Sequence, residues 1–175
     1  RVNKAAYPNL ATPVATDYLI LTDQSDNLIT KSCTLGDVQG LFGVDTLVSK
    51  VQINSAALLT LNTTAATLVN APGAGKVIDV ISIMFYLDAG SQAYDFGTGS
   101  LPVKIGAQEI ATVPNSNTTV NSATDAVFKP EVPNSNEIIA QNTAVTLEAQ
   151  ANPTQGTGVL YANVFYRVLT VGSTF

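Results

Sequence analysis

The chain has 175 residues with a net charge of -5, no His and a single Cys. Nucleic-acid binding needs clustered Lys and Arg to displace counterions from phosphates, and the sequence has no such cluster; the same lack disfavours an anionic membrane surface. Without His, the Ser-His-Asp and Cys-His catalytic arrangements, histidine metal sites and imidazole proton transfer are excluded. We therefore predict no nucleic-acid or membrane partner, no enzyme activity, no cofactor and no metal.

Charged residues make up only 12% of the chain, about half the usual share, whereas 46% of the residues are hydrophobic. A chain of this length and composition can bury a sizeable core and suits one domain with an appendage. The low charge indicates an assembly that buries much of the surface, and the alternative is a soluble β protein with a neutral polar surface. The lone Cys33 excludes an intrachain disulfide and is compatible with synthesis in a reducing compartment.

The N-terminal part of the sequence predicts a β-hairpin followed by a short helix. Two strand-like runs, Tyr18–Leu21 and Leu28–Cys33, flank the turn-forming cluster Asp23–Asn27. Thr34 is then a plausible helix N-cap and Gly43 a plausible stop, and between them apolar residues recur at helical spacing: Leu35, Val38, Leu41 and Phe42. Such a unit is too small to be stable alone, so it must dock on the rest of the chain, a neighbouring copy or another protein.

From Thr46 onward the sequence predicts strands. The two longest, Lys76–Leu87 and Gly156–Leu169, are apolar on both faces, so we expect them at the centre of a sandwich, covered by a second sheet, a second subunit or both. One face of the last strand carries Val159, Tyr161, Phe165 and Leu169. One helical turn capped by Ser55 is also expected. The shorter candidate strands are Val48–Ile53, Ala66–Asn70, Gln92–Phe96, Pro102–Ile105, Gln108–Val113, Ala126–Lys129, Glu137–Ala140 and Val145–Ala149.

These elements favour an all-β fold, a jelly-roll-like β-sandwich, because two sheets of about eight strands fit the pattern and no helical run follows residue 60. An immunoglobulin-like sandwich is the nearest alternative. Ahead of the sandwich we expect an N-terminal extended arm over residues 1–16, with a disordered terminus as the alternative, and then the hairpin and helix. The predicted domains are therefore 1–46 for the arm, hairpin and helix, and 47–175 for the sandwich.

Several patterns resemble chemical motifs but are better explained as structure. Gly73-Ala74-Gly75-Lys76 lacks the spacing and the following helix of a phosphate loop, so it predicts a turn. Asp23–Asn27 lacks the Gly and Glu of a calcium loop, and turn chemistry explains it. Asp88 and Asp95 could face each other, yet the sequence gives little aromatic support for a sugar-sized cleft. We expect the aromatic residues to pack in the core or at a subunit interface: Tyr86, Tyr94, Phe96, Tyr161, Phe165 and Tyr166.

Two parts of the chain resemble bacteriophage proteins. Thr16–Asp23, followed by Thr30–Val38, is similar to the N-terminal attachment modules of tailed-bacteriophage virion proteins, in which a hairpin leads into a short helix. Ala71–Ile78, together with Asn152-Pro153 and the run from Gly156 to Arg167, resembles small phage head-decoration and head-fibre domains. The resemblance implies a jelly roll that is made in the bacterial host cytoplasm and assembles as a homotrimer on the capsid surface of the virion.

The expected function is therefore that of a non-enzymatic structural protein that decorates or cements a phage capsid. Its expected partners are further copies of itself and the major capsid protein or other virion proteins. The N-terminal segment would anchor it, unless that segment docks on the sandwich of its own chain, and the candidate partner-binding residues are Tyr18, Leu19, Ile20, Leu35, Val38, Leu41 and Phe42. The second hypothesis is a receptor- or glycan-binding tip domain of a tail fibre or adhesin, which predicts exposed aromatic residues near Tyr94–Phe96.

Overall fold

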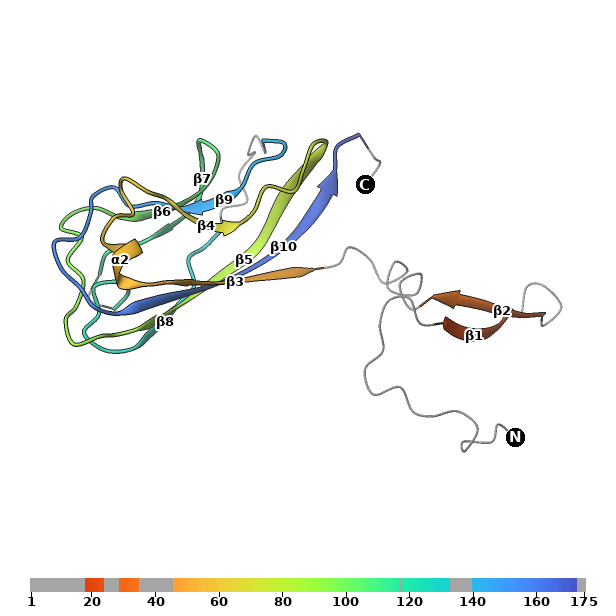
Figure 1. The fold of residues 1–175 in the computed structure, drawn as a ribbon, viewed down its shortest axis with the longest axis horizontal. Coiled ribbons are helices and arrows are strands. Elements are labelled where there is room, and N and C mark those ends of the chain that lie inside the picture. Colours follow the sequence, from red (N-terminus) through yellow and green to blue (C-terminus); the bar gives the residue numbers. More distant parts are fainter. Residues whose placement is uncertain (1–17, 24–28, 35–45, 117, 133–139, 173–175) are drawn as a thin grey trace, which may run out of the picture. The chain divides into compact units, whose positions relative to one another are not determined.

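The computed structural model describes residues 18–23, 29–34, 46–116, 118–132 and 140–172. The chain divides into two compact units, residues 1–45 and residues 46–175, and each is described by itself (Figure 1). Within the described ranges, no helix is long and apolar enough to cross a membrane.

The described part of the first unit is a β-hairpin. Strands β1 (Tyr18–Asp23) and β2 (Ile29–Thr34) pair antiparallel, and every residue of one strand lies opposite a residue of the other. The hairpin predicted from the two strand-like runs is therefore confirmed. The arm expected over residues 1–16 and the helix expected over residues 35–42 lie outside the described residues.

The second unit consists of two four-stranded antiparallel sheets and one short helix among its described residues. The strand order is β3-β10-β5-β8 in one sheet and β4-β9-β6-β7 in the other. The elements are β3 (Leu47–Ile53), α2 (Ser55–Leu58), β4 (Ala66–Val69), β5 (Lys76–Asp88), β6 (Leu101–Ile105), β7 (Gln108–Val113), β8 (Ala126–Phe128), β9 (Val145–Leu147) and β10 (Val159–Thr170).

The pairing of these strands defines a jelly roll. The innermost pair is β6 with β7, and β5 with β8, β4 with β9 and β3 with β10 follow as successively outer pairs. The second half of the unit thus runs back along the first half, like one long hairpin that is rolled up so that alternate pairs fall in different sheets. This topology confirms the predicted jelly-roll-like sandwich and differs from the strand orders of the immunoglobulin-like alternative.

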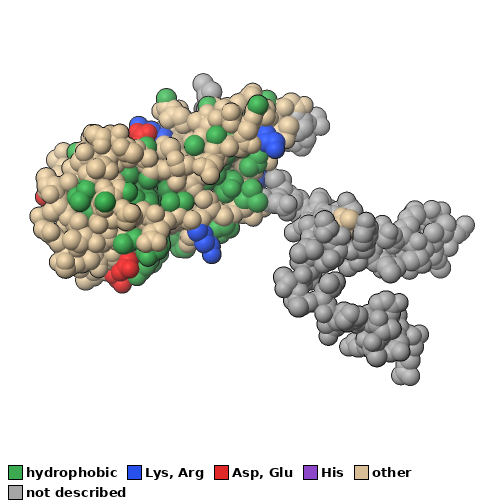
Figure 2. Space-filling view, viewed as in Figure 1, with side chains coloured by type: hydrophobic (Ala, Val, Ile, Leu, Met, Phe, Trp, Pro, Cys, Tyr) green, Lys and Arg blue, Asp and Glu red, His purple; other side chains and the backbone are tan. Residues whose placement is uncertain are grey.

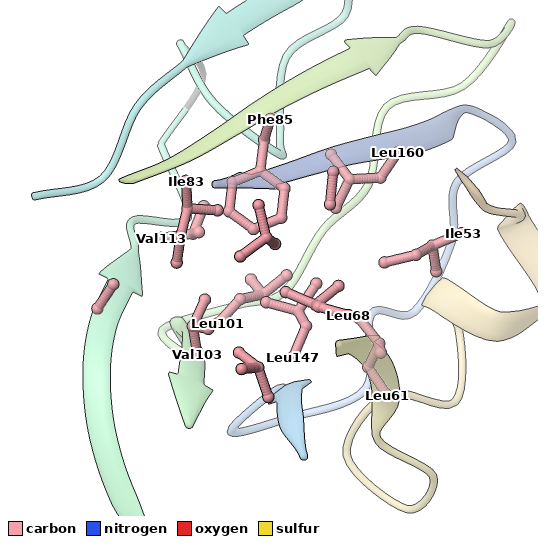
Figure 3. Packing of buried hydrophobic residues seen from close by; sticks show 14 of the residues in the cluster. Ile53, Leu61, Leu68, Ile83, Phe85, Leu101, Val103, Val113, Leu147 and Leu160 are labelled. Atoms are coloured by element: carbon pink, nitrogen blue, oxygen red, sulfur yellow. The ribbon is translucent and has the colours of Figure 1, made fainter. Parts of the chain in front are cut away.

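The hydrophobic core lies between the two sheets. The two strands predicted to be central, β5 and β10, lie side by side in the middle of their sheet. Their inward side chains, such as Ile83, Phe85 and Leu160, are fully buried together with Val103 and Leu147 from the opposite sheet (Figure 3). Burial of each such side chain contributes about 1.5–3 kcal/mol, so the core determines which face of β5 and β10 points inward.

The short helix differs from the prediction at its first residue. Asn54, and not Ser55, is the N-cap of α2: the Asn54 side chain accepts a hydrogen bond from the Ala57 amide at 2.9 Å, and Ser55 is the first helical residue. Asn and Ser are equally good caps, so the two neighbouring residues could not be told apart from their propensities.

The predicted strand Gln92–Phe96 is wrong, because this segment is an irregular loop that belongs to neither sheet. Its alternating residues Tyr94 and Phe96 are nonetheless buried, at 3% and 1% exposure. The loop is held by side-chain bonds, among them one from the Tyr94 hydroxyl to the Gly158 carbonyl at 2.6 Å. The candidate strand Glu137–Ala140 lies, except for its last residue, outside the described part of the chain. The other strands predicted between residues 46 and 172 are confirmed, with small differences at their ends.

Candidate interaction surfaces

The outward faces of the two sheets differ in polarity. The exposed large hydrophobic side chains lie on the β3-β10-β5-β8 sheet or directly after it: Leu47, Val48, Ile81, Tyr86, Val127 and Val171. On the other sheet, Thr67, Thr146 and Lys104 form an outward row, and Lys104 makes an ion pair with Glu148 at 2.6 Å. A sheet face left to water is expected to be polar, so the face that exposes these hydrophobic side chains is the unusual one. Charged side chains are also sparse in Figure 2.

Strand register arranges the outward side chains of this sheet in rows. We call the outward surface of the β3-β10-β5-β8 sheet the outer face. Its side chains come from alternate residues, whose neighbours along each strand point into the core. From β3 across β10 to β5, the three rows are Gln52-Tyr161-Tyr86, Lys50-Asn163-Met84 and Val48-Phe165-Ser82, and Val127 of β8 lies beyond Tyr86.

A β-bulge interrupts the outer face next to the third row. Strand β5 has one extra residue there, Ile81, opposite the Phe165–Tyr166 step of β10, and the Ile81 side chain is 48% exposed. Past the bulge, Arg167 donates a hydrogen bond to Asp79 across the same strand pair, so these two charges compensate each other. The outer face therefore gains an exposed apolar side chain at the bulge without gaining net charge.

The first two rows enclose a shallow hollow of about 350 Å³. It is lined by Lys50, Val51, Gln52, Tyr86, Tyr161 and Asn163. The rings of Tyr86 and Tyr161 are stacked, with centroids 5.9 Å apart and planes 26° apart. The hollow thus combines two aromatic rings with amide and ammonium groups, which can stack against a ligand and hydrogen-bond to it.

One of the two tyrosines is fixed by a carboxylate. The Tyr86 hydroxyl donates to Asp125 Oδ2 at 3.1 Å, and Asp125 Oδ1 accepts from the Ala89 amide at 2.9 Å. The hydrogen bond to Asp125 raises the pKa of the Tyr86 phenol, so this side chain remains a neutral donor at physiological pH. Asp125 in this way connects the loop after β5 to the start of β8.

The aromatic pair that the glycan hypothesis relied on does not lie at the surface. Tyr94 and Phe96 belong to the core, with ring centroids 6.0 Å apart, so the expectation of exposed aromatic residues there is wrong. The polar residue Asp95 separates the two rings, and such alternation alone does not say which side is buried. The aromatic pair on the outer face is instead the exposed Tyr86 and the half-buried Tyr161. Only the strand register shows that these two residues of β5 and β10 lie opposite each other.

Two other candidate motifs have structural roles. Gly73 and Gly75 adopt positive φ angles of 99° and 72°, and Lys76 begins strand β5, so this segment is the predicted turn. Asp95 accepts a hydrogen bond from the Gly97 amide at 2.9 Å, which stabilises a tight turn. Asp88 ends strand β5, opposite Val159.

The structure describes only three of the seven predicted anchoring residues. Tyr18, Leu19 and Ile20 lie in β1, whose backbone pairing is described. The other four, Leu35, Val38, Leu41 and Phe42, lie outside the described residues. Their role as a partner-binding surface therefore stays a prediction.

Comparison with known proteins gives distant structural similarity only. No protein-family model and no curated protein matches the chain. A chain of the cyanophage Pam1 capsid asymmetric unit is 18% identical, with 72% of this chain and 86% of that chain covered and a TM-score of 0.44. A chain of the capsid of Ralstonia phage GP4 is 17% identical, with 74% and 86% covered and a TM-score of 0.34.

Proposed function

We propose that the chain is a structural protein of a bacteriophage virion that decorates or cements the capsid as a homotrimer. The observation that carries this proposal is a difference between the two outward faces of the jelly roll. The outer face exposes Val48, Ile81, Tyr86 and Val127 among polar side chains, whereas the outward face of the other sheet is polar. Viral capsid proteins and lectins both use jelly rolls, and the fold alone does not decide between such functions. A group of exposed hydrophobic side chains gathered on one sheet face favours a role in interaction.

The phage setting of the proposal rests on the N-terminal resemblance. Strands β1 and β2 form the hairpin expected of an attachment module, and the sequence Thr34-Leu35-Gly36-Asp37-Val38 follows it directly. The similarity to the two capsid chains is too low to assign the function. We assign attachment to the capsid to residues 1–46 and formation of the trimer body to residues 47–175.

The proposed mechanism is mechanical. Each copy buries apolar surface against the shell and against its neighbours, at roughly 25 cal/mol per Å². Lost translational and rotational freedom offsets much of this gain for a single copy. Repetition over a whole shell makes the total large, since each added copy ties neighbouring parts of the capsid together.

Deletion of residues 1–43 tests the attachment role. We expect the truncated chain to lose co-sedimentation with capsids, because the proposed anchor contains the apolar residues Tyr18, Leu19, Ile20, Leu35, Val38, Leu41 and Phe42. Circular dichroism and thermal unfolding of the truncated chain check that the sandwich stays folded. Unchanged capsid affinity in a folded truncated chain would show that the attachment surface lies in residues 44–175.

A second function, receptor or glycan binding, is favoured by one observation, the hollow lined by Tyr86 and Tyr161. Aromatic rings beside amide groups suit the apolar faces and vicinal hydroxyls of sugars. We expect glycan-array binding by such a protein to vanish in Tyr161→Ala. Thr67→Ala is the control, since Thr67 lies in β4, on the polar outward face of the other sheet.

A further inference from the structure

We propose that the outer face of the β3-β10-β5-β8 sheet is the seam at which copies of this chain pack against each other, an inference that rests on the homotrimer of the proposed function. The occupant of the face is thus a second copy of residues 46–175. Its exposed side chains, its area and its charges are the three observations that bear on such a seam.

The outer face carries several large hydrophobic side chains of the kind that proteins usually bury. Val48 and Val127 are 45% and 66% exposed at opposite edges of the sheet, and Tyr86 is 37% exposed between them. Phe165 and Met84, from neighbouring rows, are half-buried. Aromatic residues and Met are enriched in protein interfaces, whereas Lys, Glu and Asp are depleted.

Its size suits a protein partner. The four strands contain 7, 12, 13 and 3 residues. At about 3.3 Å per residue and about 4.8 Å between strands, they give a flat area of about 550 Å². Projecting side chains raise the accessible area above this value. A standard protein interface buries about 800 Å² on each partner, and a ring divides the outer face between two neighbours, so each contact is smaller than the standard one. A small ligand in the hollow would leave Val48, Phe165 and Val127 exposed to water.

Its charges favour a cyclic arrangement of copies. Lys50 lies on β3 at one edge of the face, whereas Asp88 and Asp125 lie beside β8 at the other edge, with Lys129 at the far end of β8. In a ring, each subunit meets its neighbours through two different surfaces, and in the proposed seam these are the two edges of the outer face. The β3 edge of one copy then brings its ammonium group to the carboxylates of the next copy. Asp79 and Arg167 already compensate each other within the chain.

Single charged substitutions in the full-length chain test the seam. The variants are Val48→Asp and Val127→Asp, at exposed positions where folding of one copy tolerates a carboxylate, and the control is Thr67→Asp on the polar face. Light scattering of the wild type is expected to give three times the 18.2 kDa subunit mass. Both outer-face variants are expected to lose this trimer, with a threefold drop in mass, while the control keeps it.

The outcomes separate this inference from the proposed function. Trimers that persist in both folded outer-face variants would place the seam elsewhere and leave the proposed trimer standing. A monomeric wild type would overturn the seam and the homotrimer together, and capsid co-sedimentation would then decide the decoration role on its own. Glycan binding by an intact, monomeric wild type would assign the face to a ligand.

A charge exchange keeps the test independent of any folding defect. Lys50→Glu alone is expected to weaken the trimer, because it faces Asp88 and Asp125 of the neighbouring copy. Lys50→Glu combined with Asp88→Lys is expected to restore the trimer mass. Equal weakening in the single and double variants would contradict the cyclic contact between these two edges.

Discussion

Tyr94 shows how one side chain can hold a loop that has no strand pairing. Its hydroxyl donates to the Gly158 carbonyl at 2.6 Å, and burial raises the pKa of its phenol to about 12 from the ordinary 10.0. In the unfolded chain the same phenol ionises near pH 10. The neutral form is therefore the one that the fold stabilises.

This shift predicts a loss of stability in alkaline solution. The contribution of Tyr94 is fully present below pH 10 and is lost as the pH rises from 10 to 12, by about 2 kcal/mol or less. Urea unfolding at several pH values measures it, and Tyr94→Phe is the control. The variant should be less stable at pH 7 by about 1–3 kcal/mol, because the Gly158 carbonyl loses its donor. It should also show a shallower fall above pH 10; parallel curves would contradict the assignment to Tyr94.

Gly156 is required by the same contact. It adopts a φ of 141°, and a Cβ atom at this position would overlap the ring of Tyr94. We expect Gly156→Ala to lower the unfolding free energy by about 3 kcal/mol or more. Gly73→Ala is the matched control, since Gly73 also has a positive φ, 99°, but no atom lies near its Cβ position. The control should cost about 1–2 kcal/mol. Equal losses in the two variants would mean that backbone conformation alone explains the effect.

Among the strands, β5 contains a bulge, and its position determines which residue can be deleted without turning other side chains to the opposite face of the sheet. Ser82 and Val80, on either side of Ile81, already lie opposite consecutive residues of β10. Deletion of Ile81 therefore leaves every other β5 side chain on its present face. We expect this variant to keep a cooperative unfolding transition within about 2 kcal/mol of the wild type.

The matched control is deletion of Met84, which lies beyond the bulge. To keep the remaining register, Ile83 would move to the outer face and Ser82 would enter the core. A buried hydroxyl in place of an Ile side chain is expected to cost about 3 kcal/mol or more or to prevent folding. Thermal unfolding followed by circular dichroism compares the two deletions, and similar behaviour would contradict the register at the bulge.

The elements also show what could be predicted from the sequence. Long strands such as β5 and β10 were predictable because β-branched and aromatic residues fill both of their faces. The Gln92–Phe96 loop was mistaken for a strand because Tyr94 and Phe96 alternate like strand residues, although hydrogen bonds outside any ladder hold them. The neighbours Lys50, Tyr161 and Tyr86 come from three strands that are distant in sequence, so their meeting depends on register, which periodicity does not encode.

For the whole unit, the nested pairing predicts an order of folding events. The β6–β7 pair closes a short loop, whereas β3 and β10 must meet across most of the unit, and long-range pairing is slow. Ile105 and Ile53 are both buried, at 4% and 3% exposure, and lie in an inner and an outer pair, respectively. We expect Ile105→Ala chiefly to slow folding and Ile53→Ala chiefly to speed unfolding, each at a cost of about 2–5 kcal/mol. Stopped-flow kinetics distinguishes the two effects, and the reverse pattern would place the β3–β10 pair first.

The outermost pair of the roll also determines where foreign sequence can be added. Leu47, the first residue of β3, lies opposite Tyr166, close to the point at which β10 ends. A peptide fused after residue 175 would therefore leave the sandwich at the same end at which residues 1–45 enter it. Under the proposed attachment role, in which those residues bind the capsid, such a fusion would be crowded against the shell. The turn at Gly97, at the end of the sandwich where β5 stops and β10 starts, is the better insertion point for displaying an epitope or an enzyme to solution.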